Sequence, residues 1–171
     1  MKYLVLILVA ALSFSSCQEQ QKLAFIDNGK VINEYQEKID LEKKYEQKDL
    51  AFQKRRDSMI SNYQLELKDA QLKAKNMSQA NLQKLSQEIQ QKEQLLTQRI
   101  QMEQQQMQKA FQTDIDSLIV KVKNFVNDYG KKNQYSYIFG TSDTAASVLY
   151  GSEDLSQTII DALNADYKKE E

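Results

Sequence analysis

The chain offers few side chains that could carry out acid–base or nucleophilic chemistry. It has no histidine, so an acid–base enzyme would depend on carboxylates, lysine or tyrosine. Asp114 and Asp116 lie two residues apart and would face different sides of a helix. Ser142 and Asp143 share a polar segment with no base nearby. The sequence therefore predicts no enzyme, no catalytic residue and no cofactor.

A single cysteine, Cys17, is the only thiol in the chain. One thiol and no histidine cannot form a zinc site of the cysteine–histidine type, and they leave no disulfide within one chain. The position of Cys17, directly after an apolar run, is more informative than its chemistry. The sequence predicts that this cysteine has a role in targeting the protein and not in catalysis or metal binding.

The first residues have the pattern of an export signal. Met1 and Lys2 give a charged start, and residues 3–12 are an apolar run of ten residues. A membrane-spanning helix needs about 20 residues, so this run is too short to cross a bilayer. Its length and its flanks match the apolar region of a signal peptide, which is removed from the mature protein. We predict that residues 1–16 are such a signal.

The segment FSSC, which ends at Cys17, resembles a relaxed bacterial lipobox. The resemblance implies that Cys17 becomes the acylated first residue of a lipoprotein, with residues 17–21 as a tether. Acyl chains would hold the protein on a membrane surface. The pattern departs from the usual one at Phe14, so ordinary cleavage and a soluble periplasmic protein stay possible. Gln18 favours the outer membrane by analogy with enterobacterial sorting.

The charge of the chain gives no reason to expect a nucleic-acid partner. Its net charge is −1, and it becomes −2 when residues 1–16 are removed. Residues 33–133 carry a net charge of +3 and the rest of the mature chain carries −5. Neither value produces the strong basic field that nucleic-acid binding needs.

The middle of the chain is predicted to be a long coiled coil. Proline is absent, and no glycine occurs between Lys30 and Tyr129. The residues there are mostly straight-chain types that favour helices. Apolar residues recur every three, four or seven positions, which is the spacing of a narrow coiled-coil seam. They are Tyr45, Phe52, Met59, Tyr63, Leu67, Ala70, Ala74 and Met77, and then Phe111, Ile115, Leu118, Val122, Phe125 and Tyr129.

This helical segment is predicted to fold back on itself. A single helix of that length would extend about 150 Å at 1.5 Å per residue. The weakest helical stretch is 76–81, so we place a turn there and expect an antiparallel helical hairpin over residues 33–133, here called the arm. Folding at this turn brings Tyr45 near Asp114 and Phe52 near Met107.

The second half of the arm is rich in glutamine, with eleven glutamines between Leu82 and Gln108. One interpretation is a solvated helical surface. The other is a soft, weakly charged surface that contacts many partners, because methionine side chains adapt to different shapes. The candidate contact residues of the arm are Met59, Tyr63, Met77, Met102 and Met107.

The two ends of the mature chain contain short strands. The strand candidates are LAFID (Leu23–Asp27), YSYIFG (Tyr135–Gly140) and SVLYG (Ser147–Gly151), and an amphipathic helix follows over Asp154–Tyr167. Asp27 is expected to cap a short helix after the first strand. Three short strands cannot make a stable sheet from one copy, so this region, residues 22–32 and 134–171, is predicted to oligomerise. We call it the body. The fold class is α+β and mostly α.

These segments together resemble the Skp/OmpH family of periplasmic chaperones. The resemblance rests on KLAFIDNGKVINEY, on the glutamine-rich hairpin and on YSYIFGTSDTAASVLYGSEDLSQTIIDALNADY, and it covers Lys22 to Tyr167. The closing positions of the family pattern are occupied by Ala145, Val148, Tyr150, Asp154, Leu155, Ser156 and Ile159. This chain differs from the strongly basic, soluble enterobacterial members by its mild acidity and its lipobox-like segment.

The resemblance implies a homotrimer whose pooled strands form a small barrel. Three hairpins would project from it around a cavity that holds unfolded outer-membrane proteins, without nucleotide or metal. The expected oligomerisation residues are Leu23, Phe25, Tyr137, Phe139, Val148 and Tyr150. The alternative is a structural coiled-coil envelope lipoprotein that acts as a spacer or adaptor. Such a protein would not need the β-containing body, which favours the chaperone.

Overall fold

The computed structural model describes residues 21–142, 148 and 150–170. It confirms an α+β fold that is mostly helical, with a small sheet and a long helical hairpin. The predicted signal peptide, Cys17 and most of the tether lie outside the described residues. The elements are β1 (Leu23–Asp27), α2 (Asn28–Glu34), α3 (Gln36–Ala74), α4 (Gln79–Lys132), β2 (Tyr137–Thr141) and α5 (Ser156–Glu170). Among the residues described, no helix is long and apolar enough to cross a bilayer.

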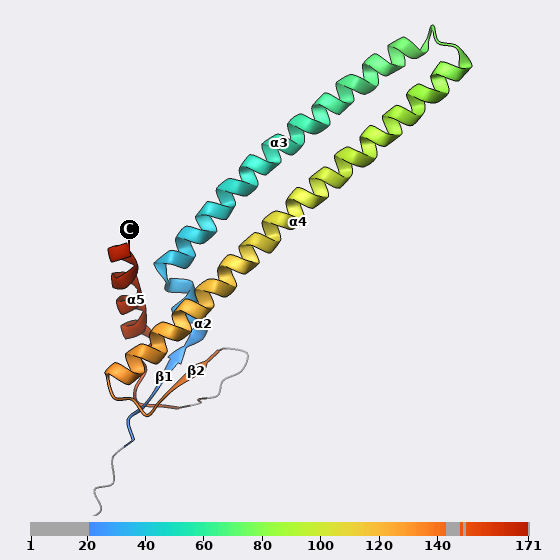
Figure 1. Cartoon of the computed structure of the whole chain (residues 1–171). Coiled ribbons are helices and arrows are strands. Elements are labelled where there is room, and N and C mark those ends of the chain that lie inside the picture. The colour runs from blue at the N-terminus through green and yellow to red at the C-terminus, as the bar shows by residue number, and fades with distance from the viewer. Residues whose placement is uncertain (1–20, 143–147, 149, 171) are drawn as a thin grey trace, which may run out of the picture.

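Helices α3 and α4 form the antiparallel hairpin, which projects far beyond the other elements (Figure 1). Residues 75–78 connect the two helices and overlap the range predicted for the turn. The predicted proximity of Tyr45 and Asp114 is confirmed, because the Tyr45 hydroxyl donates a hydrogen bond of 2.9 Å to Asp114 Oδ2. The Tyr45 ring also packs edge-on against Phe111, with centroids 5.0 Å apart. The helices therefore meet along the predicted seam.

The sheet consists of two parallel strands from opposite ends of the chain. β1 pairs with β2 in a register that places Leu23 opposite Tyr137 and Asp27 opposite Thr141. A parallel pair needs a long crossover connection, and here the whole arm provides it. β2 spans Tyr137–Thr141, so it begins two residues later than predicted.

The predicted strand Ser147–Gly151 is not found at its described residues. Val148, Tyr150 and Gly151 have no strand structure, and positions 147 and 149 lie outside the described residues. The free edge of β1 pairs instead with the segment just before α5. The Phe25 N–H donates to the Glu153 carbonyl at 3.0 Å, and the Leu155 N–H donates to the Phe25 carbonyl at 2.9 Å. The pairing lies closer to α5 than the β pattern indicated, because Leu155 belongs to the buried core.

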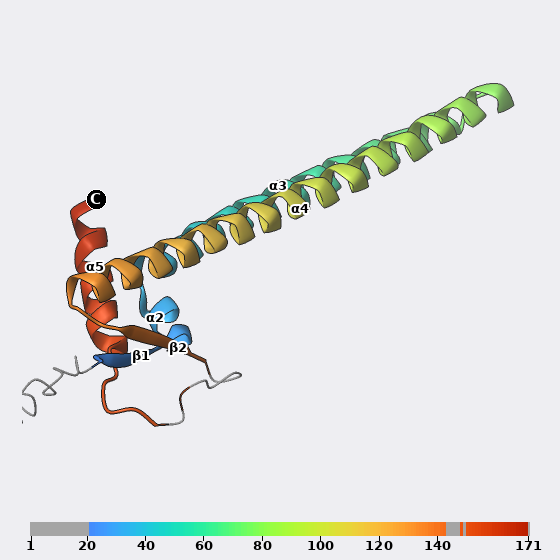
Figure 2. The same ribbon diagram turned by 60° about the horizontal axis from the view of Figure 1, so that its bottom comes forward.

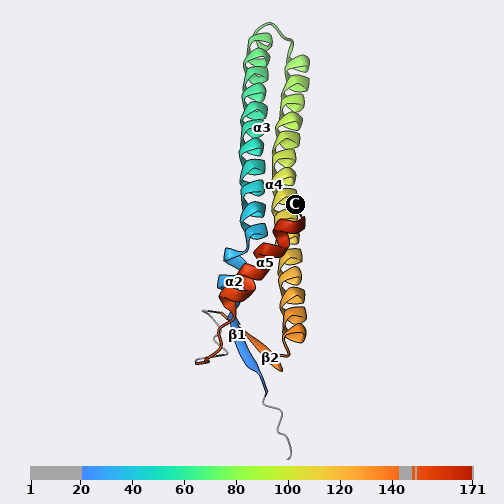
Figure 3. The same cartoon turned by 90° about the vertical axis from the view of Figure 1, so that its left-hand side faces the viewer.

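The core lies where α5 packs across the base of the hairpin, against α2 and β1 (Figures 2 and 3). Ile159 and Leu163 are fully buried there, so the apolar side predicted for the last helix is confirmed. The core contains residues from every element except α3 and β2, which contribute half-buried neighbours. Its buried members are Ala24, Ile26, Val31, Tyr35, Leu118, Val122, Leu155, Ile159, Ile160 and Leu163.

A polar network joins the first strand to the last helix. The Asp27 carboxylate accepts a 3.0 Å hydrogen bond from the Lys30 N–H, which confirms it as a helix cap. The Asp27 N–H donates at 2.8 Å to Oγ of Ser156, which is almost fully buried. The Ser156 hydroxyl and its N–H both donate to Asp154 Oδ1, at 2.5 and 2.8 Å. These two bonds hold the pKa of Asp154 below its ordinary value, against the opposing effect of burial.

This network predicts a stability effect that depends on pH. A carboxyl group with a lowered folded-state pKa stabilises the fold above its ordinary pKa of 3.8, and the contribution disappears as the pH falls through the folded-state value. Ser156→Ala should lower the free energy of unfolding by about 1–3 kcal/mol at pH 7, and by less at pH 2–3. Urea unfolding followed by circular dichroism measures both values.

The control is Ser61→Ala, at an exposed position of α3, which should change the free energy by no more than about 0.5 kcal/mol. An equal penalty for Ser156→Ala at both pH values would contradict the role given to Asp154.

Candidate functional site

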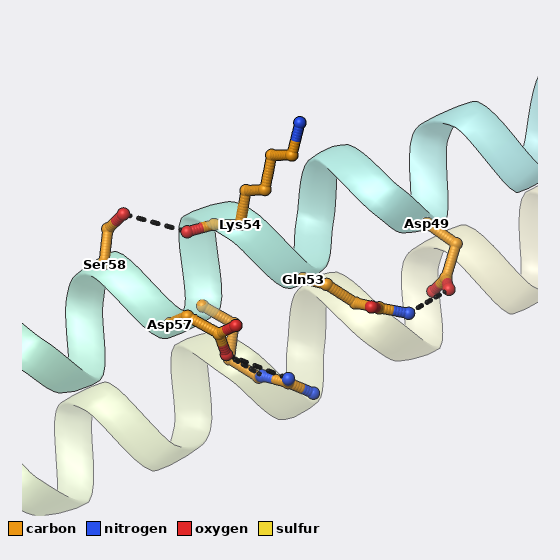
Figure 4. Close-up of polar contacts among 6 residues, drawn as sticks. Asp49, Gln53, Lys54, Asp57 and Ser58 are labelled. Carbon is orange, nitrogen blue, oxygen red and sulfur yellow. Dashed lines mark hydrogen bonds and ion pairs between the residues drawn. The ribbon is translucent and has the colours of Figure 1, made fainter.

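The outer surface of the arm is polar and largely satisfied by contacts within each helix. On α3 the Gln53 amide donates to Asp49 Oδ2 at 2.6 Å, and the Ser58 hydroxyl donates to the Lys54 carbonyl at 2.9 Å (Figure 4). Arg56 pairs with the neighbouring Asp57 at 2.9 Å. Exposed pairs of this kind contribute little to stability and keep a helix solvated.

Isolated large apolar side chains interrupt this polar surface. Leu65, Leu72, Leu95 and Met102 are each more than half exposed. Leu65 and Leu72 are seven residues apart, as are Leu95 and Met102, so each pair lies along one strip of its helix. Single exposed apolar residues are common on proteins, but their repetition on one face of a helix gives a sequence of small contact points.

The structure places most of the predicted contact residues of the arm in the seam. Met59 and Tyr63 lie half-buried where α3 and α4 meet, Met77 is half-buried in the connection between the helices, and Met107 is half-buried on α4; of the five, only Met102 is well exposed, at 55%. Because the heptad spacing that identified the first three also defines the seam, these side chains divide their surface between the partner helix and solvent.

A shallow groove follows the middle of the arm where α3 and α4 meet. It consists of two adjoining hollows of about 340 and 370 Å³, which share Met59, Asn62 and Arg99. Leu95 is on its rim. The other lining residues are Lys54, Arg55, Ser58, Tyr63, Glu66, Lys92, Leu96 and Glu103. The groove combines apolar stems with charged ends, which suits loose contact with an extended chain.

Two ion pairs cross this groove. The Lys92 ammonium lies 2.6 Å from Glu66 Oε2, and Arg55 pairs with Glu103. The hydrogen bond from Lys92 to Glu66 raises the pKa of Lys92. Each pair joins positions almost equally distant from the turn predicted at 76–81, so the hairpin arithmetic could have predicted them. With both pairs formed, the lining still carries four basic and two acidic side chains, so the groove is weakly positive.

The body presents an apolar face that one chain does not cover. Exposed fractions are 46% for Leu23, 59% for Tyr137, 44% for Phe139 and 91% for Tyr150. The rings of Tyr137 and Phe139 stack with centroids 6.0 Å apart. A hollow of about 710 Å³ in this face is lined by five of the six predicted oligomerisation residues, namely Leu23, Phe25, Phe139, Val148 and Tyr150.

The sheet also has an open edge beside this face. β1 is paired on both sides, with β2 and with the segment around Asp154. In residues 21–142, 148 and 150–170, no strand pairs with the outer edge of β2. An open edge next to exposed aromatic rings can accept a further strand.

The carboxylates weighed as catalytic candidates have structural partners. Asp114 accepts the Tyr45 hydrogen bond and lies 3.9 Å from the Lys44 ammonium. Asp116 accepts a 2.8 Å hydrogen bond from the Gln112 amide one helical turn away. Asp143 lies outside the described residues. In the part of the chain that the structure describes, no group of acidic or thiol side chains could hold a metal ion.

A family model described as "Outer membrane protein (OmpH-like)" matches residues 22–163. The chain belongs to the OmpH-like family. This is a family of periplasmic chaperones, so the resemblance noted in the sequence is confirmed. No curated protein sequence matches this chain.

One solved structure supports the fold of this OmpH-like chain independently. It is the crystal structure of a candidate outer membrane chaperone (OmpH-like) from Caulobacter crescentus CB15. The match has a TM-score of 0.73 and covers 86% of each chain, at 11% sequence identity. At that identity the likeness concerns the fold alone.

Two neighbouring leucines test the division between the seam and the outer surface. Leu96 is half-buried in the seam, whereas Leu95 is 65% exposed. Leu96→Ser should lower the free energy of unfolding of the arm by about 1–2 kcal/mol, because it removes buried apolar area. Leu95→Ser should change it by no more than about 0.5 kcal/mol. Urea unfolding followed at 222 nm compares the two, and equal losses would show that the surface assignment is wrong.

Proposed function

We propose that this chain is an ATP-independent periplasmic holdase that binds unfolded outer-membrane proteins between its helical arms and prevents their aggregation. The observation that carries the proposal is the combination, in an OmpH-like chain, of a long arm bearing isolated apolar side chains with a small body whose apolar face is uncovered. α4 alone contains 54 residues and is therefore about 80 Å long.

The physical demand on such a protein is to keep clients apart without binding them tightly. Unfolded barrel proteins expose alternating apolar residues and unpaired strand edges, which makes them aggregate. Many weak contacts acting together hold a chain as well as one tight site, and each is easily released. The exposed Leu65, Leu72, Leu95 and Met102, and the groove that Met59 and Tyr63 line, would supply such contacts. Met77 and Met107 would add the exposed part of their side chains.

We further propose that the body, residues 22–32 and 134–171, joins three chains and that residues 33–133 form the arm of each. Leu23, Phe25, Tyr137, Phe139, Val148 and Tyr150 would form the contact between copies. Burial of this apolar face would remove its aromatic rings from water, and the open edge of β2 would gain a partner strand.

Residues 1–16 would act as the signal peptide, and acylation of Cys17 would anchor the mature chain through a tether at 17–21, in the outer membrane. The observation behind this part is the FSSC segment after the apolar run. Fatty-acid labelling in cells should mark the wild-type protein and be lost with Cys17→Ser. Equal labelling of both would exclude acylation at this residue, and absence of label from the wild type would favour a soluble periplasmic protein.

The holdase is tested by diluting a urea-unfolded β-barrel protein into buffer and recording light scattering. The wild-type chain should suppress scattering, and Leu95→Ser/Met102→Ser should require several-fold more protein for the same effect. The matched control is Gln94→Ser/Gln101→Ser, which alters neighbouring exposed residues of the same helix and should behave as the wild type. A wild-type chain that leaves scattering unchanged would favour the spacer or adaptor.

The assembly is tested by the mass of the folded protein in solution. We expect about three times the mass of one chain. Phe139→Asp should shift the protein to single chains, because a buried, unpaired charge is costly. Val120→Asp is the control, since Val120 is 55% exposed and lies on α4. A wild-type protein that remains one chain at micromolar concentration would contradict the proposed contact.

A further inference from the structure

The break between α2 and α3 has no cause in the local sequence. α2 ends at Glu34 and α3 begins at Gln36, so only Tyr35, with φ −72° and ψ 122°, interrupts the helix. Chain breaks of this kind are usually made by proline or glycine. The chain has no proline, and no glycine occurs between Lys30 and Tyr129.

The side chain of Asn164, in α5, makes two hydrogen bonds to the backbone at the break. Its Oδ1 accepts from the Gln36 N–H at 2.7 Å, and its Nδ2 donates to the Glu34 carbonyl at 3.3 Å. Tyr35 makes no capping bond to α3 with its own side chain. One amide, 128 residues from Gln36 in the sequence, therefore caps the end of one helix and the start of the next.

The bend is also held by the side chain that it turns inward. Tyr35 is 1% exposed, and its ring packs edge-on against Tyr167 of α5 with centroids 6.1 Å apart. Its hydroxyl donates to Glu37 Oε2 at 2.5 Å, and Lys121 of α4 lies 2.8 Å from the same oxygen. The start of α3 is therefore held by contacts from both α5 and α4.

The alternative conformation of this segment is an uninterrupted helix. In such a helix the Gln36 N–H would bond to the Ile32 carbonyl and the Lys38 N–H to the Glu34 carbonyl. In the bent form the Lys38 N–H bonds to the Tyr35 carbonyl at 3.1 Å, and Asn164 bonds to the Gln36 N–H and to the Glu34 carbonyl. The residues around the break are compatible with either form, so the outcome depends on tertiary contacts.

We propose that Asn164 is a positioning residue that keeps the helix bent at Tyr35 and thereby sets the direction in which α3 leaves the body. A straight segment would withdraw Tyr35 from the core and carry α3 away from α4. The proposal concerns the geometry of one chain and does not rest on the identity of any client.

The test measures the bend directly. Spin labels at Lys30→Cys and Ala51→Cys, both exposed positions on the two sides of the break, are placed in the full chain with Cys17→Ser and diluted with unlabelled chain. A straight helix separates these positions by about 32 Å, and a bend shortens the distance. The parent chain should show one short distance. Asn164→Ala should shift a large fraction of molecules to the longer one.

Hydrogen exchange of residues 34–38 is the second measurement. Asn164→Ala should accelerate exchange of the Gln36 amide about tenfold. Asn164→Asp should retain the protection of the Gln36 amide, because its carboxylate accepts that N–H at the positive end of a helix, and should lose part of the bend, because a carboxylate cannot donate to the Glu34 carbonyl. Asn127→Ala, at an exposed position of α4, is the control and should change neither readout. If Asn164→Ala does not fold, Asn164→Gln, with its amide displaced by one methylene, carries the same expectation.

The proposal is overturned if the parent chain already shows the long distance. It is also overturned if Asn164→Ala, or Asn164→Gln in its place, matches Asn127→Ala in both distance and exchange. A loss of thermal stability with an unchanged bend would equally overturn it, since that result describes a purely structural contact.

Discussion

Packing of α5 against β1, α2 and the lower end of the hairpin holds the body and the arm together. Ile159 and Leu163 are fully buried in a core that also contains Val31 of α2 and Leu118 of α4. This is where the two ends of the chain meet, because β1 and β2 are separated in the sequence by the whole arm. The arm has only a narrow seam of its own, so its lower end is fixed to the body by this small core.

The division of apolar residues between seam, core and surface accounts for the architecture of this chain in physical terms. Tyr45 and Phe52 are buried in the seam, whereas Leu65 and Leu95 of the same hairpin are exposed. A long hairpin of this kind has a large surface and little interior, which provides many weak contact points and no deep pocket. The exposed apolar residues of the body, around Phe139, are instead gathered at one place on its surface.

Local patterns predicted the elements well and the long-range polar contacts poorly. The strand Leu23–Asp27 and the buried side of the last helix follow from a short apolar segment and from helical spacing. The β pattern predicts a further strand at 147–151, whereas β1 pairs with Glu153 and Leu155. β propensity could not reveal this, because the position of the pairing is decided by which side chain must enter the core.

A polar helical hairpin with short strands at its base can be predicted from the sequence, since heptad spacing and the absence of proline act within a few residues of one another. The position of the bend between α2 and α3, and the choice of which arm side chains remain exposed, depend on contacts between distant segments. Asn164 caps a helix 128 residues away, and no local pattern encodes such a bond. Tyr35 could continue a helix as readily as interrupt one, so its conformation depends on what packs against it.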